Sequence, residues 1–180
     1  MKLEYEDRSE STPEEKAYSD YIKTHIENVK KAYSVLRDIL KRNLNYDESE
    51  LSDRINKHDE TKYSTEEFEP YRSRFYPKEG ESRNDKAFNE AWFHHLHNND
   101  HHPEYWTYVD DDNKKVVLDM PDICIAEMIL DWFTFCYKNN NSKDIVDYWR
   151  KNGIKKPLSS NTKSKVARII EQIDYEDIKI

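Results

Sequence analysis

The chain has 180 residues, a formal net charge of −8, and 37% charged against 36% hydrophobic residues. This length suffices for one domain with a buried core, whereas the acidic balance disfavours long nucleic acid as a partner. The most apolar stretch, residues 123–137, contains two carboxylates and is too short to span a bilayer, and no signal-like apolar run opens the chain. We therefore expect a cytoplasmic protein without a membrane partner.

The composition predicts an all-α fold. Two glycines disfavour sheets built from tight hairpins, and 4 Trp, 13 Tyr and 6 Phe disfavour disorder. We expect a flexible N-terminus over residues 1–11 and a single helical bundle over residues 12–180. Its non-helical parts should be one long ordered loop and a small β-hairpin.

The first helix is predicted from Thr12 to about Arg42. Thr12-Pro-Glu-Glu15 has the pattern of a capping box with proline in the first turn. His25 falls within the apolar stripe of this helix and should point at the core. A lone histidine there is commonly a satisfied core residue, so its role depends on its partners.

A second helix is predicted from about Ser49, with His58 on its apolar face. Asp59 would stand roughly 100° around the helix from His58, so that one ion could meet both side chains. Residues 63–84 contain two prolines and a glycine. We interpret them as a long ordered loop and a candidate substrate lid.

A third helix is predicted from about Asn84 to the run Asn98-Asn-Asp, with a possible small hairpin over residues 106–117 after it. A fourth helix should run from Met120 to about Tyr137, with Asp119 as its N-cap and Asp122 in its first turn. Residues 142–152 and 162–173 give two further helices. Two cysteines, Cys124 and Cys136, should be buried free thiols.

The histidines are the most informative feature of the chain. Five of the seven lie within nine residues: His94, His95, His97, His101 and His102. Imidazole is the commonest metal-binding side chain, and carboxylates are its usual partners for divalent ions. Histidines and acidic residues at separate points of a helical chain therefore predict a metal site assembled from several helices.

The order His25, His58-Asp59, the histidine cluster and Asp122 resembles the HD-domain metal-dependent phosphohydrolase superfamily. The resemblance covers roughly residues 15–137. His58-Asp-Glu-Thr-Lys62 is similar to the His-Asp-x-x-Lys form of the branch that cleaves cyclic dinucleotides. The stretch from His94 to Pro103 resembles an uncharacterised HD-like family of bacteria and their phages.

The sequence also departs from two branches of this superfamily. The nucleotidases usually carry a glutamate where this chain has Lys62. The cyclic-dinucleotide branch carries a later Gly-Tyr-Pro signature that is absent here. Neither branch is therefore matched in full.

The resemblance implies a site for one or two divalent ions. His25, His58, Asp59 and Asp122 would hold the first. Asp59 would bridge to a second ion held by one histidine of each pair, with His95 and His102 preferred and His94 and His101 as alternatives. The pattern does not distinguish manganese, iron, cobalt, zinc, nickel and magnesium.

Further residues are candidates for contacts around the ions. Lys62 could hold a phosphoryl oxygen as a point charge, beside Asp59 as the catalytic carboxylate. Asn98 and Asn99 could orient substrate or histidine nitrogens. Arg72 and Arg74 are candidate substrate contacts, with solvated loop charges as the alternative.

These residues predict hydrolysis of a nucleotide or another small phosphate ester by metal-activated water. Two alternatives remain open. Some HD-fold proteins hold a di-iron centre and use dioxygen, and the chain could also be a non-enzymatic, metal-stabilised binding protein.

Overall fold

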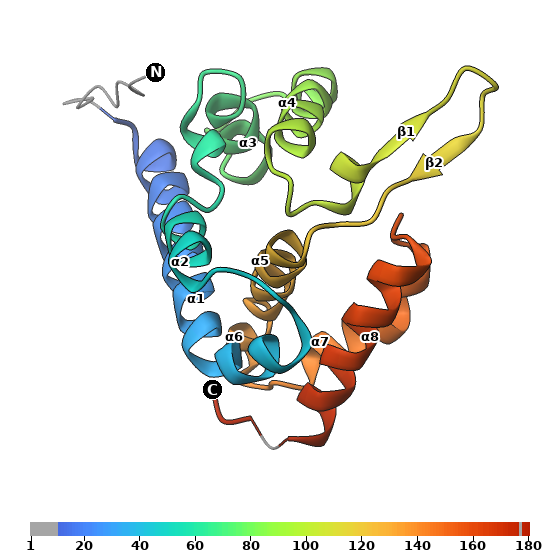
Figure 1. The fold of residues 1–180 in the computed structure, drawn as a ribbon. Helices are drawn as coiled ribbons and strands as arrows, with labels where there is room; N and C mark the ends of the chain where they lie inside the picture. The colour runs from blue at the N-terminus through green and yellow to red at the C-terminus, as the bar shows by residue number, and fades with distance from the viewer. Residues whose placement is uncertain (1–10, 177) are drawn as a thin grey trace.

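The computed structural model describes residues 11–176 and 178–180, apart from the side chain of residue 154. The flexible N-terminus predicted over residues 1–11 therefore lies, except for residue 11, outside the described residues. The α-helices are α1 (Pro13–Asn43), α2 (Glu48–Asn56), α3 (Phe68–Phe75), α4 (Asp85–Asn98), α5 (Asp122–Phe133), α6 (Cys136–Asn139), α7 (Asp144–Asn152) and α8 (Ser160–Tyr175). The predicted all-α class is confirmed (Figure 1).

Short elements connect these helices. The 3₁₀ helices are η1 (Glu60–Tyr63), η2 (Pro103–Trp106) and η3 (Gly153–Lys155), and the strands are β1 (Thr107–Val109) and β2 (Lys115–Val117). The strands pair antiparallel, with Tyr108 opposite Val116, and the hairpin projects away from the helices (Figure 1). The predicted small hairpin is confirmed. None of the helices in the described ranges is both long and apolar enough to cross a bilayer.

Helix α1 starts with the predicted capping box. The Thr12 hydroxyl accepts from the Glu15 amide, and the Glu15 carboxylate accepts from the Thr12 amide, which satisfies two of the helix's free N–H groups. The helix then contributes to two separate apolar cores. Tyr18 and Ile22 belong to the smaller core, and Val29 is the first α1 residue of the larger one.

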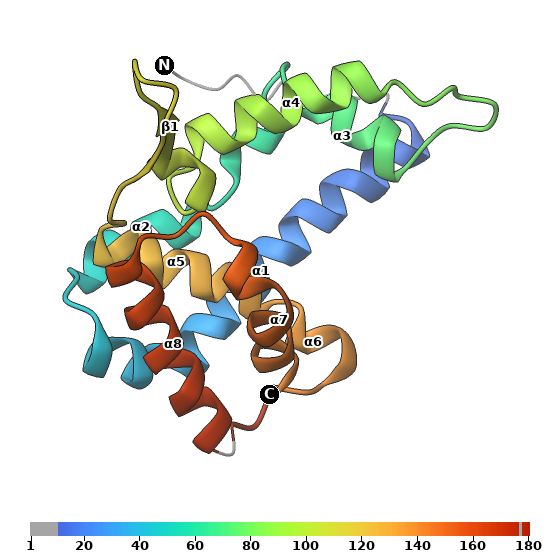
Figure 2. The same ribbon diagram turned by 90° about the vertical axis from the view of Figure 1, so that its right-hand side faces the viewer.

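The two cores lie on opposite sides of the middle of α1. Helices α3 and α4 pack together against the N-terminal part of α1, and α5, α7 and α8 pack around its C-terminal part (Figures 1 and 2). Helix α2 contacts both α1 and α5. Since His25 lies between Ile22 and Val29 in the sequence, it faces the boundary between the two cores.

Two element predictions are corrected by the structure. The stretch 63–84 contains α3, and only its later part is a loop; Pro70 lies in the first turn of α3, where its missing N–H costs no helical hydrogen bond. The fourth predicted helix breaks after Phe133 and resumes as α6. The N-cap of α5 is Pro121 and not the predicted Asp119. Asp119 instead accepts hydrogen bonds from Ser159 and Asn161 at the start of α8.

Candidate metal centre

Histidines and carboxylates from five parts of the chain meet at the boundary between the two cores. The contributing residues are His25 on α1, His58 and Asp59 after α2, His95 on α4, His101 and His102 in the turn after α4, and Glu127 and Asp131 on α5. Most of these side chains are buried. Such a concentration of polar groups in an interior requires compensation by pairing or by a cation.

The first group of candidate ligands is His25, His58 and Asp131. Nε2 of His25 lies 3.3 Å from Nε2 of His58 and 3.1 Å from Oδ1 of Asp131. Nε2 of His58 lies 3.7 Å from the same oxygen. Two nitrogens bound to one ion at about 2.1 Å stand roughly 3.0 to 3.4 Å apart, so this spacing fits a shared ion.

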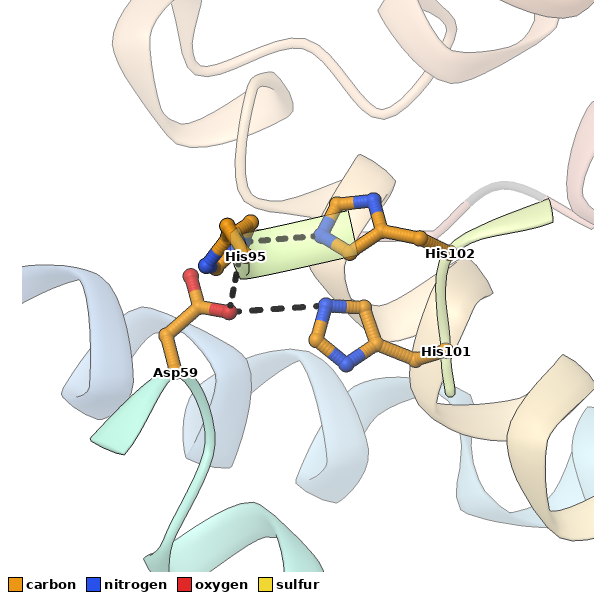
Figure 3. Close-up of side chains that lie close together, drawn as sticks. All are labelled: Asp59, His95, His101 and His102. Carbon is orange, nitrogen blue, oxygen red and sulfur yellow. Dashed lines mark hydrogen bonds and ion pairs between the residues drawn. The ribbon is translucent and has the colours of Figure 1, made fainter. Parts of the chain in front are cut away.

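The second group is Asp59, His95, His101 and His102 (Figure 3). Oδ1 of Asp59 lies 3.4 Å from Nε2 of His95 and 3.5 Å from Nε2 of His101. Nε2 of His102 lies 2.9 Å from Nε2 of His95. Oδ1 of Asp59 and Nε2 of His101 are buried without a hydrogen-bond partner among the described residues. Atoms left in this way point to a ligand such as a small cation.

Asp59 stands between the two groups. Its second oxygen, Oδ2, lies 3.6 Å from Nε2 of His25 and 3.7 Å from Nε2 of His58. Its backbone is left-handed, with φ of 56°, a conformation that costs a non-glycine residue about 1 kcal/mol. The predicted placement of the pair on the second helix is wrong, because α2 ends at Asn56 and a tight turn directs both side chains inward.

Carboxylates orient the imidazoles from behind. Nδ1 of His58 lies 2.9 Å from Glu127, and Nδ1 of His95 lies 2.8 Å from Glu67. A carboxylate can only accept, so we assign the proton of each ring to Nδ1. The Nε2 atoms then face the centre and become ligands once they carry no proton, as in metal-binding histidines.

The electrostatics favour a cation at this place. Burial alone would raise the pKa of Asp59, but Lys62 Nζ, 2.6 Å from Oδ2, and the His58 imidazole hold this pKa well below its ordinary value. Burial lowers the pKa of His58, yet Asp59 and Asp131 outweigh burial and raise that pKa to about 10. Burial together with His101 lowers the pKa of His102 to about 2, which keeps this ring neutral and able to bind a metal.

The late carboxylate of the site was predicted at the wrong residue. Asp122 accepts a hydrogen bond from the Asn45 amide at 2.8 Å and pairs with Lys165 at 2.6 Å. It therefore belongs to the start of α5 and to none of the candidate ligand groups. The carboxylate that meets His25 is Asp131, nine residues further along α5.

The structure brings the other predicted ligands together. His25, His58 and Asp59 lie in the cluster as expected, and His95 is the member of the first histidine pair that does so. We predicted one ligand from the pair His101 and His102, but both lie in the second group. His94 and the exposed His97 stand outside, with His94 Nδ1 2.7 Å from Glu67.

Of the asparagines and arginines predicted to contact substrate or histidines, one lies beside the cluster and the others lie away from it. Asn99 donates to Thr61 at 2.8 Å and lies beside His95, whereas the exposed Asn98 only bonds back to the α4 backbone. The guanidinium of Arg72 is bound by Glu69 and Glu81, and that of Arg74 by Asp85. The substrate contact predicted for these two arginines stays a prediction, since in this structure carboxylates outside the cluster pair with both.

A cavity of about 450 Å³ lies beside the cluster, between α2 and the end of α4. Asp59, His101 and Glu127 reach its wall, together with Arg54 and Asn99. The cluster therefore borders a cavity lined by polar side chains on the side that faces α2.

The fold and the cluster define a helical protein whose buried histidines and carboxylates could hold a metal ion. The chain belongs to the family described as Family of unknown function (DUF5662), whose model matches residues 14–172. No curated protein and no solved structure matches the chain. The matched range includes every residue of the cluster.

Proposed function

We propose that this chain is a metal-dependent phosphohydrolase that acts on a nucleotide or another small phosphate ester. One observation carries the proposal: each oxygen of Asp59 faces a different group of histidines. Oδ2 faces His25 and His58, and Oδ1 faces His95 and His101. A carboxylate between two sets of ligands is suited to bridge two ions, and paired ions are common in enzymes that cleave phosphate esters.

When bound, divalent ions supply a water with its pKa lowered toward 7 and neutralise phosphoryl oxygens. The chain's own residues position these groups. Lys62 is mostly buried, with its Nζ 2.6 Å from Asp59 Oδ2, so its charge is directed at the bridging position. This placement supports a role in holding a phosphoryl oxygen as a point charge.

Each ligand group has partly exposed members. The side chains of His25 and Asp131 in the first group are 11% and 17% exposed, and His102 in the second group is also half-buried, whereas His58, Asp59 and His101 are buried. These half-buried side chains are where a substrate would first meet either group.

The test is elemental analysis of the purified protein, followed by phosphomonoesters and cyclic nucleotides assayed with manganese, cobalt or magnesium under anaerobic conditions. We expect phosphate release that Asp59→Asn reduces by at least roughly 100-fold. Asparagine tolerates a left-handed backbone, so this variant should fold.

Two results would replace the proposal. Oxygen consumption that requires iron would identify the oxidative alternative. Bound metal without any turnover across the panel would identify a metal-stabilised binding protein.

A further inference from the structure

Glu127 lies on the outer, Nδ1 side of histidines from both ligand groups. It is 3% exposed, and its Oε1 lies 2.9 Å from Nδ1 of His58 and 3.4 Å from Nδ1 of His101. His58 belongs to the first ligand group and His101 to the second, and the two also lie close enough to Glu127 to form a third candidate group with it. One buried oxygen therefore contacts the outer nitrogens of imidazoles that serve two different ion positions.

We propose that Glu127 is a positioning residue shared by the two ion positions, so that its loss weakens the binding of both ions. This inference rests on the two-ion site of the proposed function. Glu127 accepts from Nδ1 of His58 and lies 3.4 Å from Nδ1 of His101, so both rings turn Nε2 toward the centre.

The other oxygen of Glu127 is held in place. Oε2 accepts from Nε of Arg54 at 2.7 Å, and the same guanidinium pairs with Asp100, the residue before His101. Arg54 therefore connects α2, α5 and the turn that carries His101. With the carboxylate fixed at Oε2, Oε1 has little freedom to follow one imidazole at the expense of the other.

Glu67 provides a matched comparison within the same protein. It is fully buried and accepts from Nδ1 of His94 at 2.7 Å and from Nδ1 of His95 at 2.8 Å. Only His95 belongs to a ligand group. Glu67 therefore supports one ion position, whereas Glu127 supports both.

The experiment is a titration of the metal-free protein with cobalt(II), followed by visible absorbance and by calorimetry. Wild type should bind two ions. Glu127→Gln should weaken both by about 10- to 100-fold, because the amide oxygen can face either the two imidazoles or Arg54, and the amide N–H groups then face the other donors. Glu67→Gln should weaken one ion by a similar factor and leave the other unchanged.

A second variant keeps the inference testable if Glu127→Gln does not fold. Arg54→Lys retains the carboxylate but loses the guanidinium fork, and it should weaken both ions by a few-fold. Weakening of only one ion by Glu127→Gln, or by Arg54→Lys where the first variant does not fold, overturns the inference.

The outcome is separable from that of the proposed function, because no substrate is present in the titration. Two bound ions that Glu127→Gln weakens together, without phosphate release from any ester, would retain the inference and refute the hydrolase. A single bound ion in wild type would overturn the inference, while phosphate release still decided the activity.

Discussion

Three imidazoles of the cluster each face a carboxylate with Nδ1 and the cluster centre with Nε2. The pairs are His58 and His101 with Glu127, and His95 with Glu67. This arrangement fixes both the tautomer and the tilt of each ring before any ligand arrives. At the scale of single residues, the interior is therefore organised around outer carboxylates as much as around the ligands themselves.

The two aspartates of α5 should respond differently to loss of charge. Asp131→Asn removes an oxygen anion 3.1 Å from Nε2 of His25, so we expect metal affinity to fall by at least about 10-fold. Asp122→Asn removes only the contacts with Lys165 and the Asn45 amide, so metal content should be unchanged and stability should fall by about 1 kcal/mol. Elemental analysis and urea denaturation measure the two effects. Equal metal loss in both variants would contradict the assignment.

The sequence could locate the histidines but could not select between these aspartates. Asp122 and Asp131 are nine residues apart on one helix, which places them roughly 180° apart around its axis. The choice depends on which face and which end of α5 meets His25, and tertiary packing decides this. Glu67 carries no spacing signal either, because it lies before α3 in a stretch whose pattern indicated a loop.

At the scale of elements, Arg72 stabilises the loop after α3 through hydrogen bonds. Its guanidinium donates to Glu81 at 2.7 Å and also reaches the Tyr76 carbonyl. These hydrogen bonds, with the Lys78 amide, lower the pKa of Glu81 to about 2, against an ordinary value of 4.5. The resulting stabilisation is present above pH 4.5 and is lost as the pH falls toward 2, because the native carboxylate binds protons less readily than the unfolded one.

We therefore expect the loop over residues 76–84 to become sensitive to acid-active protease as the pH falls below 4.5. Glu81→Gln should be cleaved there at all pH values, since its side chain no longer carries the charge. Pepsin digestion mapped by mass spectrometry, with wild type beside the variant from pH 5 to pH 2, measures this. A pH-independent wild-type pattern would show that the pair does not hold the loop.

Gly153 ends α7 for a reason of packing. Its backbone φ is −57°, which any residue adopts, but an added Cβ would lie 2.3 Å from the Trp149 ring. We expect Gly153→Ala to lower the free energy of unfolding by about 1 to 3 kcal/mol through overpacking. Gly80, with φ of +73° and nothing within 4 Å of its Cβ position, is the matched control.

Gly80→Ala should cost about 1 kcal/mol through backbone strain alone. Thermal unfolding followed by circular dichroism and by tryptophan fluorescence compares the two variants. The fluorescence of Gly153→Ala should also shift, because Trp149 must move to admit the methyl group. An unchanged stability and spectrum for Gly153→Ala would contradict the packing argument.

Elements with strong end signals were predicted better than those without. The capping box at Thr12 located the start of α1, and the turn residues located the hairpin. Helix α3 was not predicted because a proline with charged neighbours is typical of a loop. Pro70 is compatible with a helix here only because it lies in the first turn of α3. The break after Phe133 was missed because the apolar run continues through it.

At the scale of the whole molecule, the cluster lies between two apolar cores, and α1 contributes residues to both of them. His95 belongs to α4, which packs in the smaller core, and Asp131 belongs to α5, which packs in the larger one. An ion bound to both groups through Asp59 would link the cores directly. Such a ligand stabilises only the state in which both are folded and docked.

We therefore expect bound metal to raise the stability of the entire domain. At 100 times its dissociation constant, an ion contributes about 2.7 kcal/mol, or roughly 5 to 10 °C in the melting temperature of a chain this long. Calorimetry with manganese or with chelator measures the shift, and amide exchange should slow in α4 and α5 together. Asp59→Asn should show neither effect, because it lacks the bridging charge. A rise in melting temperature confined to one core, or an equal rise in the variant, would mean that the ion binds elsewhere than between the cores.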